Sequence, residues 1–474
     1  HPTKTFSGGM YGSGFSYGND MMTRNENTSF NGNIDYQRFL NRDRTSNITL
    51  SYLFTTDPTT TESRNIYDPL PAGIPLTLND LYSNSKMRGT EHTFQADYTT
   101  PLSKNQTLNA GAKFIGRRNT SDSKFYNIIN GKEVFDSNNS VNYKNTQSIL
   151  ASYIEYKLTL GKFSAKAGAR YEHTWENVEF ILGKGDDFKK NYGNLVPSAS
   201  FTYNIGAAVN VGVNYNMRIS RPGISFLNPY IDRSTPTVLS YGNPNLDVEE
   251  SHNVSLVFNA FTPKFMINLT LGEAFANNQI EQYSFMDANG ILNTTYGNIV
   301  RSRWTNFSTF INYSITPNTR IYLNGGFDYG DMRSDKLNQK KHAWQAMAFI
   351  GLQQTLPWNV KMSINTGGMT KRHTLQGYGN GFSMINLALA KDFFNEKLNV
   401  SLNYFTPFSG KIRQDQYSAG ADFTQRTNMV ISVQQVGLTL TWHFGNTKKQ
   451  FQTNKSNISN DFQEKKNDNQ VVVT

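Results

Sequence analysis

Residues 207–219 read AAVNVGVNYNMRI, and their side chains alternate between two classes. One class, at the odd positions, is Ala207, Val209, Val211, Val213, Tyr215, Met217 and Ile219; the other includes Asn210, Asn214, Asn216 and Arg218. Successive side chains of a β-strand point to opposite faces, so this stretch predicts a strand with one apolar and one polar face. The same alternation recurs at 265–271, 344–352, 398–404 and 436–444.

The composition fits such strands and excludes several other classes of protein. Of 474 residues, 37% are hydrophobic and 13% aromatic, and there is no cysteine. No segment approaches 18 consecutive apolar residues, which excludes a helical membrane protein, and the aromatic content is too high for a disordered chain. The absence of cysteine excludes disulfide scaffolds and thiol chemistry.

The length of the alternating spans favours a transmembrane antiparallel β-barrel over a soluble sandwich. Many spans cover 12–20 residues, whereas a soluble strand usually covers about 5–6. We expect about 18 strands, beginning with spans at 5–19 and 25–40. Short turns are expected at 101–105, 161–162, 205–206, 262–264, 316–318, 357–359 and 394–396. Longer polar connections alternate with them near 57–89, 127–145, 183–191, 222–247, 334–341 and 411–422, which is the pattern of an outer-membrane barrel.

Two further expectations follow from the barrel. Lipid would surround the outer wall, so Val209, Val211, Val213 and Leu402 should face outward and Asn214, Asn216 and Asn403 should face a polar lumen. Residues 1–444 would form the barrel. Residues 445–474 are rich in Asn, Lys, Gln and Ser and predict a disordered periplasmic tail, with a docking segment at 471–473 as the alternative.

The net charge of +10 leaves two interpretations open. Solvated loops and a wet lumen account for it, and so does contact with phosphates on lipopolysaccharide or on a ligand. Nucleic acid is not expected, because the basic residues are dispersed rather than clustered. Since the barrel lies in the outer membrane in this interpretation, its expected partners are outer-membrane lipid and lipopolysaccharide.

The densest turn sequence lies at 218–250, where RISRPGISFLNPY (218–230) is followed by YGNPNLDVEE (241–250). Its prolines fix φ and its glycines permit tight turns, so this long connection should be structured. The run resembles the signature loop in the barrels of TonB-dependent outer-membrane receptors, in particular the large Bacteroidetes-type family. The positions that carry the resemblance are Arg221, Pro222, Gly242, Asn243, Pro244, Leu246 and Glu249. Val248 stands where the common form has proline.

The resemblance, which covers roughly residues 1–444, implies a 22-stranded barrel around an N-terminal plug. Because only about 18 strands are expected here and no plug-like segment precedes them, we expect a fragment of a longer receptor, with a complete smaller barrel as the alternative. The resemblance also implies uptake of a scarce ligand (a siderophore, another metal chelate, a glycan or a peptide) driven by a TonB-type energy transducer through the plug. A surface lipoprotein is a possible further partner. The candidate ligand contacts are Arg218, Arg221, Tyr230, Arg233 and Tyr241, and the same residues could instead fold the loop.

The last alternating span resembles the aromatic-ended terminal strand that barrel-assembly machinery recognises. Its signal residues are Val436, Leu438, Leu440, Trp442 and Phe444, which are equally suited to face lipid. Two other functions stay open: a non-TonB barrel with a passive, structural or adhesive role, and a rim-active hydrolase.

Catalytic and metal sites are weakly supported. The seven histidines are scattered, none in a metal-ligand spacing. Asp328 with Asp331, and Asp186 with Asp187, are more simply solvated loop residues, and Gly183 with Gly185 precedes no helix that could hold a phosphate. We therefore expect no catalytic residue, no metal and no cofactor.

Overall fold

A computed structural model describes residues 3–6, 15–74, 77–183, 187–227, 231–235, 238–445, 458 and 464–465. Within these residues the chain is almost entirely strand, with one sheet of 23 strands and a second of four. The helices there are a single turn, α1 (Ile224–Leu227), and a 3-10 turn at Pro357–Asn359. None of the described helices is long and apolar enough to cross a membrane.

The strands of the first half are β1 (Thr3–Phe6), β2 (Phe15–Asn27), β3 (Phe30–Phe39), β4 (Asn47–Tyr67), β5 (Asp80–Ser103), β6 (Gln106–Ile129), β7 (Lys132–Phe135), β8 (Val141–Leu160), β9 (Phe163–Leu182), β10 (Phe188–Asn204), β11 (Val209–Pro222), β12 (Asp232–Thr235) and β13 (Val238–Ser240). Those of the second half are β14 (Glu249–Phe261), β15 (Phe265–Met286), β16 (Leu292–Thr316), β17 (Thr319–Ser334), β18 (Gln339–Leu356), β19 (Val360–Met369), β20 (Arg372–His373), β21 (Gly377–Gly379), β22 (Phe382–Phe393), β23 (Leu398–Pro407), β24 (Lys411–Ala419), β25 (Thr424–Ser432), β26 (Gln435–Trp442) and β27 (Glu464–Lys465).

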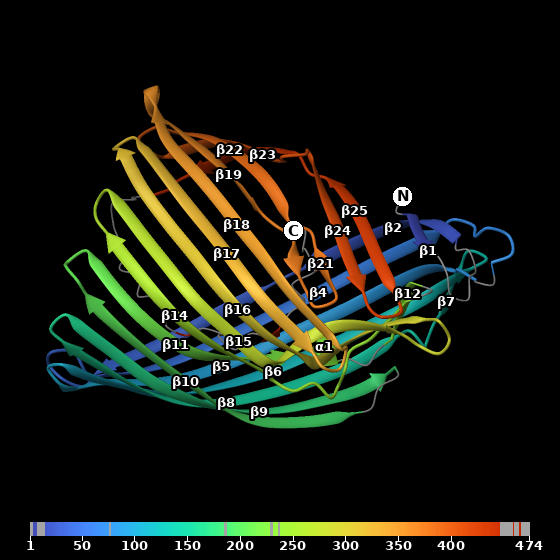
Figure 1. Cartoon of the computed structure of the whole chain (residues 1–474), viewed down its shortest axis with the longest axis horizontal. Coiled ribbons are helices and arrows are strands. Elements are labelled where there is room, and N and C mark those ends of the chain that lie inside the picture. Colours follow the sequence, from blue (N-terminus) through green and yellow to red (C-terminus); the bar gives the residue numbers. More distant parts are fainter. Residues whose placement is uncertain are drawn as a thin grey trace.

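The long strands pair antiparallel with their neighbours in chain order, so the sheet is one continuous meander from β4 to β26. Where a short strand lies within a loop, the long strands on either side pair directly: β6 with β8, β11 with β14, β19 with β22 and β23 with β26. Figure 1 shows the sheet curling, so that the blue strands of the first part lie behind the yellow and orange strands of the second part. This antiparallel, curved sheet confirms the predicted all-β barrel fold.

The N-terminal strands differ from the two spans expected at 5–19 and 25–40. β2 and β3 lie on the same side of β4 and keep one register across the short break between them, since Asn27 lies opposite Thr59 and Phe30 opposite Thr56. They therefore act as one long interrupted strand. The turn expected near residue 20 is replaced by strand. The next turn, expected after residue 40, lies at residues 40–46, where Asn41 accepts hydrogen bonds from the amides of Thr45 and Ser46.

The two ends of the sheet differ in their connections. The seven short turns lie at one end, which we call the short-turn end, and their observed limits agree with those expected from the sequence within about three residues. The other end, the long-loop end, has shorter loops than expected because the strands extend into them. β4 continues to Tyr67, and most of 411–422 belongs to β24, which pairs with β25 in the separate four-stranded sheet.

The two faces of the wall carry opposite chemistry. On β9, Glu172, Thr174 and Glu176 are at most 3% exposed, while Tyr171 and Trp175 between them are 48% and 44% exposed. Val213 and Leu402, expected to face outward, are each 47% exposed. A wall that shows large apolar groups outward and encloses charged groups is the inverse of a soluble protein, and it is what a barrel in lipid requires.

Candidate functional site

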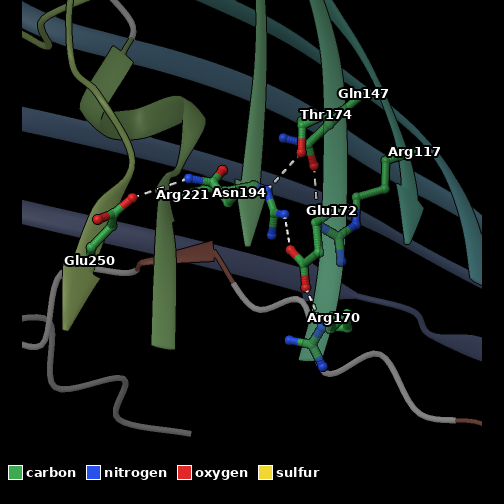
Figure 2. Close-up of polar contacts among 8 residues, drawn as sticks. All are labelled: Arg117, Gln147, Arg170, Glu172, Thr174, Asn194, Arg221 and Glu250. Carbon is green, nitrogen blue, oxygen red and sulfur yellow. Dashed lines mark hydrogen bonds and ion pairs between the residues drawn. The ribbon is translucent and has the colours of Figure 1, made fainter. Parts of the chain in front are cut away.

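The candidate site begins where β11 separates from β10. The pairing of β11 with β10 ends at Asn216, opposite Ser198, while its pairing with β14 continues to Ser220. The freed end of β11 brings Arg221 against the enclosed face of β9. There the Arg221 guanidinium forms an ion pair with Glu172, and its Nε donates to Thr174 Oγ1 over 3.0 Å, as Figure 2 shows.

This ion pair is deeply buried. The side chains of Arg221 and Glu172 are 2% and 0% exposed. A buried carboxylate needs several partners to offset its lost hydration, and Glu172 has a second one, Arg170, whose Nε lies 2.6 Å from its Oε1. Removing Arg221 would leave the buried carboxylate of Glu172 with a single partner, so the arrangement fixes the end of β11 in one position.

Polar groups continue along the same enclosed face. Arg117 of β6 forms an ion pair with Glu91 of β5 and donates to Gln147 Oε1 of β8 over 3.2 Å. Farther toward the long-loop end, Glu176 accepts hydrogen bonds from Asn145 Nδ2 at 2.9 Å and from the Tyr192 hydroxyl at 3.1 Å. The lumen wall at β5–β10 is thus a connected polar surface held in fixed geometry.

The loop after Arg221 folds around Asn243. The Asn243 amide donates to the Phe226 carbonyl, its Nδ2 donates to the Tyr296 carbonyl over 2.9 Å, and its Oδ1 accepts from the Asn245 amide at 2.9 Å. These bonds join α1, the G-N-P-N turn and β16. The asparagine side chain supplies both donor and acceptor at a turn, which explains why the residue between Gly242 and Pro244 is asparagine.

The rest of the loop motif completes a small core. Leu246 packs with Phe226, Leu227 and Ile280, against Phe188 and Tyr296. The Glu249 side chain accepts from the Ile280 amide at 2.8 Å, and Asn278 bonds the backbone at Val248. Pro222 and Gly242 are buried within the same loop. All seven motif positions therefore lie in one folded unit.

The five candidate ligand contacts occupy different environments. Arg218 is exposed, Arg221 is buried, and Tyr241 is half-buried. Burial, together with nearby Tyr283 and Asp287, raises the pKa of Tyr241. Tyr230 lies outside the described residues, and the structure places Arg233 in β12. Arg218 and Tyr241 are thus the candidates that remain accessible.

The predicted terminal-strand signal lies on β26, at the edge of the sheet. Val436, Leu438 and Leu440 are 72%, 66% and 64% exposed, and Trp442 and Phe444 are exposed as well. Their common exposure fits a lipid-facing surface. Residues 471–473 lie outside the described part of the chain, but β27 pairs in parallel with Arg221 and Pro222.

No group of three or more metal-ligating side chains occurs among the described residues. Three histidines bond to tyrosines instead: His92 to Tyr52, His173 to Tyr171 and His252 to Tyr215. Asp331 pairs with Arg333, and Asp328 accepts from Gln345. Asp187 caps the Phe180 amide, Gly183 ends β9 at a positive φ of 114°, and Asp186 and Gly185 lie outside the described residues.

The sequence analysis did not identify Glu172 and Thr174 as partners of the loop. The signal for them is present, because charged or hydroxyl residues at 172, 174 and 176 alternate with Tyr171, His173 and Trp175. Such an alternation places Glu172 in the lumen. It does not indicate which loop residue meets it.

A family model for the outer membrane protein beta-barrel family matches residues 37–442. Among solved structures, the ferric preacinetobactin receptor BauA from Acinetobacter baumannii aligns with a TM-score of 0.59 and 13% identity over 89% of this chain and 63% of that one. The siderophore receptor PiuA from Acinetobacter baumannii aligns with a TM-score of 0.57 and 10% identity over 93% of this chain and 80% of that one.

The ferric yersiniabactin uptake receptor FyuA from Yersinia pestis gives a TM-score of 0.56 and 12% identity over 83% of this chain and 60% of that one. The chain therefore spans about three fifths of the length of FyuA and BauA. At such identities these likenesses show the shared fold. No curated protein matches the sequence. The match over 37–442, together with the inverted wall, shows that the chain belongs to the outer membrane protein beta-barrel family and resides in the outer membrane of a Gram-negative bacterium.

Proposed function

We propose that this chain is the barrel of a TonB-dependent receptor that takes up a scarce ligand: a siderophore, another metal chelate, a glycan or a peptide. The observation that carries the proposal is the loop motif at Arg221–Pro222 and Gly242–Glu249, which resembles the signature loop of those receptors and is held to the lumen wall by the Arg221–Glu172 ion pair. The solved structures with the same fold include receptors for ferric siderophores, which favours this class of cargo.

The surroundings of the candidate residues suggest different roles for them. Arg221 is enclosed by β9, so it positions the loop, whereas Arg218 is exposed and Tyr241 is half-buried beside Tyr283. A cation and a hydroxyl near the mouth suit an anionic or hydroxyl-rich ligand, because both can donate hydrogen bonds to it. We infer that Arg218 and Tyr241 contact the ligand.

The barrel comprises residues 1–444 in this proposal, and the exposed edge residues of β26 serve as the assembly signal. Energy would reach the ligand path through a plug contacted by a TonB-type transducer. The connected polar face of β5–β10 offers such a plug a rigid hydrogen-bonding wall, since its charges are held by fixed partners such as Glu91 and Glu172.

Uptake by cells tests the proposal. A strain lacking the gene is complemented with the full-length gene and offered radiolabelled ferric siderophores, copper chelates, oligosaccharides and peptides. Accumulation of one class should require the gene and should stop when TonB is deleted. Arg218→Ala and Tyr241→Phe should lower ligand affinity while the barrel still assembles in the membrane.

Two outcomes would favour the other functions. Gene-dependent entry of many small solutes without TonB would indicate a passive pore. Release of a hydrolysis product from an outer-membrane lipid or protein by the purified chain would indicate a rim-active hydrolase.

A further inference from the structure

The outer face of β4–β9 carries an aromatic row that crosses the strands. Tyr52, Phe94, Phe114, Leu150 and His173 lie opposite one another on five consecutive strands. Phe94, Phe114 and Leu150 are all exposed. Because the groups are large, apolar and adjacent, they form a continuous surface that suits hydrocarbon rather than water.

The height of this row can be placed relative to the membrane. Phe94 lies about ten residues along β5 from the short turn at Lys104–Asn105, which is about 33 Å of strand and about 25 Å of height at a tilt of about 40°. The apolar band of outer-membrane barrels is about 25 Å tall, with short turns on the periplasmic side. Phe94 therefore lies near the outer boundary of the hydrocarbon.

Small and basic groups replace the apolar ones just above the row. At the next outward position, Gly116 of β6 lies between His92 and Ser148, and we call this level of small side chains the step. Beyond the step, Arg118 lies opposite Thr90, and Arg88 lies opposite Thr120. Arg88 and Arg118 are diagonal neighbours on adjacent strands, about 7–8 Å apart at the backbone, and both are exposed.

These two arginines lack a carboxylate partner within the described residues. Lys144 lies on the far side of Thr120 and has Glu179 opposite it without forming an ion pair. The corresponding face of β15–β18 is different: Arg303 pairs with Glu273 over 2.6 Å, Arg333 pairs with Asp331 over 2.7 Å, and Arg301 pairs with Asp335. The outward arginines of β16 and β17 therefore have carboxylate partners, whereas Arg88 of β5 and Arg118 of β6 have none in the described part of the chain.

We propose that Arg88 and Arg118 form a binding site for the phosphate groups of an acylated, phosphorylated lipid of the outer leaflet. The guanidinium groups would hold the phosphate, because Arg forms bidentate, charge-assisted bonds to it. The acyl chains would lie on Phe94, Phe114 and Leu150, below the step at Gly116. A lipid suits this surface better than a soluble anion, since the apolar and basic parts adjoin at the membrane boundary.

The test compares lipid binding by the full chain and by matched double variants. Arg88→Gln with Arg118→Gln removes the two free cations, and Arg301→Gln with Arg303→Gln removes two paired cations at a similar level. Each protein in detergent micelles is titrated with bisphosphorylated lipid A, with its dephosphorylated form and with inorganic phosphate. Heat-dependent gel mobility verifies that each barrel is folded.

Lipid A should bind the first double variant about tenfold more weakly or worse, since loss of a charge-assisted bond usually costs about 1.5–3 kcal/mol. The control variant should bind lipid A as the unmodified chain does, and Arg118→Lys should weaken binding less than Arg118→Gln. Equal binding by both double variants would overturn the proposal. Equal binding of dephosphorylated lipid would show that the apolar row alone acts, and binding of inorganic phosphate with the affinity of lipid A would show a site for soluble anions.

Discussion

Arg117 and Arg118 are consecutive residues of β6, yet they have opposite surroundings. Arg117 points to the enclosed side, where it forms an ion pair with Glu91 and a 3.2 Å hydrogen bond to Gln147. Arg118 points outward, is exposed, and lies near Arg88 above the aromatic row. In a membrane strand the period of two therefore sets more than polarity. The alternation also separates inward charges, which stabilise the wall through ion pairs, from outward charges, which can bind groups outside the protein.

The comparison also shows what each face demands of a charge. An enclosed cation loses hydration and must be compensated by fixed neighbours, whereas an outward cation near the membrane boundary keeps its water or binds an anion. Removing a charge should thus cost folding stability on the inner face and ligand or lipid binding on the outer face.

The largest effect is expected at the most enclosed arginine of the site, Arg221. Arg221→Met leaves Glu172 buried at 0% exposure with only Arg170 as an ionic partner, and we expect a loss of about 3–5 kcal/mol in the free energy of unfolding. Urea titration of the full chain in lipid vesicles, followed by tryptophan fluorescence, measures it.

The control for this prediction replaces both partners. The double variant Arg221→Met with Glu172→Leu should be clearly more stable than Arg221→Met alone, because it also removes the buried carboxylate that has lost one of its two ionic partners. If the single and double variants unfold at the same urea concentration, the ion pair is not what holds the end of β11.

Substitutions of Arg117 and Arg118 test the difference between the two faces of β6 directly. Arg117→Met should destabilise the chain by about 2 kcal/mol, because Glu91 and Gln147 lose a charged donor in a mostly enclosed place. Arg118→Met should change the stability by less than about 0.5 kcal/mol, as exposed substitutions usually do. The same urea titration measures both. Equal effects of the two substitutions would show that the faces do not differ in the way proposed.

A smaller effect is expected from a neutral polar group on the enclosed side. Asn243→Ala removes the hydrogen bonds to the Tyr296 carbonyl and from the Asn245 amide, for an expected loss of about 1–2 kcal/mol in the stability of the loop. Limited proteolysis of intact cells should cut the loop faster, while the barrel stays folded on gels. Asn245→Ala, at an exposed neighbouring position, is the matched control and should leave the cutting rate unchanged.

The sequence was sufficient for the fold because the barrel is built from local alternation. The faces of 207–219 and the seven short turns follow from neighbours in the chain. The turn expected near residue 20 was wrong because a local pattern cannot show that β2 and β3 share one register on β4. The Arg221–Glu172 pair escaped prediction for a similar reason: it joins residues 49 positions apart and depends on β11 separating from β10.

The smallest loss of stability concerns the turn at Asp287, which is only partly buried but has fixed partners like Arg117. The Ile291 and Asn289 amides donate to its Oδ1 over 3.0 and 2.9 Å, and Asn293 donates to Oδ2, so the pKa of Asp287 lies below its ordinary value. A depressed pKa means that the ionised form stabilises the turn. That contribution is complete above the unfolded pKa of about 3.9 and is lost as the pH falls through the lower folded value. Hydrogen exchange at the Ile291 amide, corrected for intrinsic rates, should therefore be slow and constant from pH 7 to about 5 and faster below about 4. Asp287→Asn should exchange faster at pH 7 and show no change with pH, and a pH dependence that survives this substitution would assign the protection to another group.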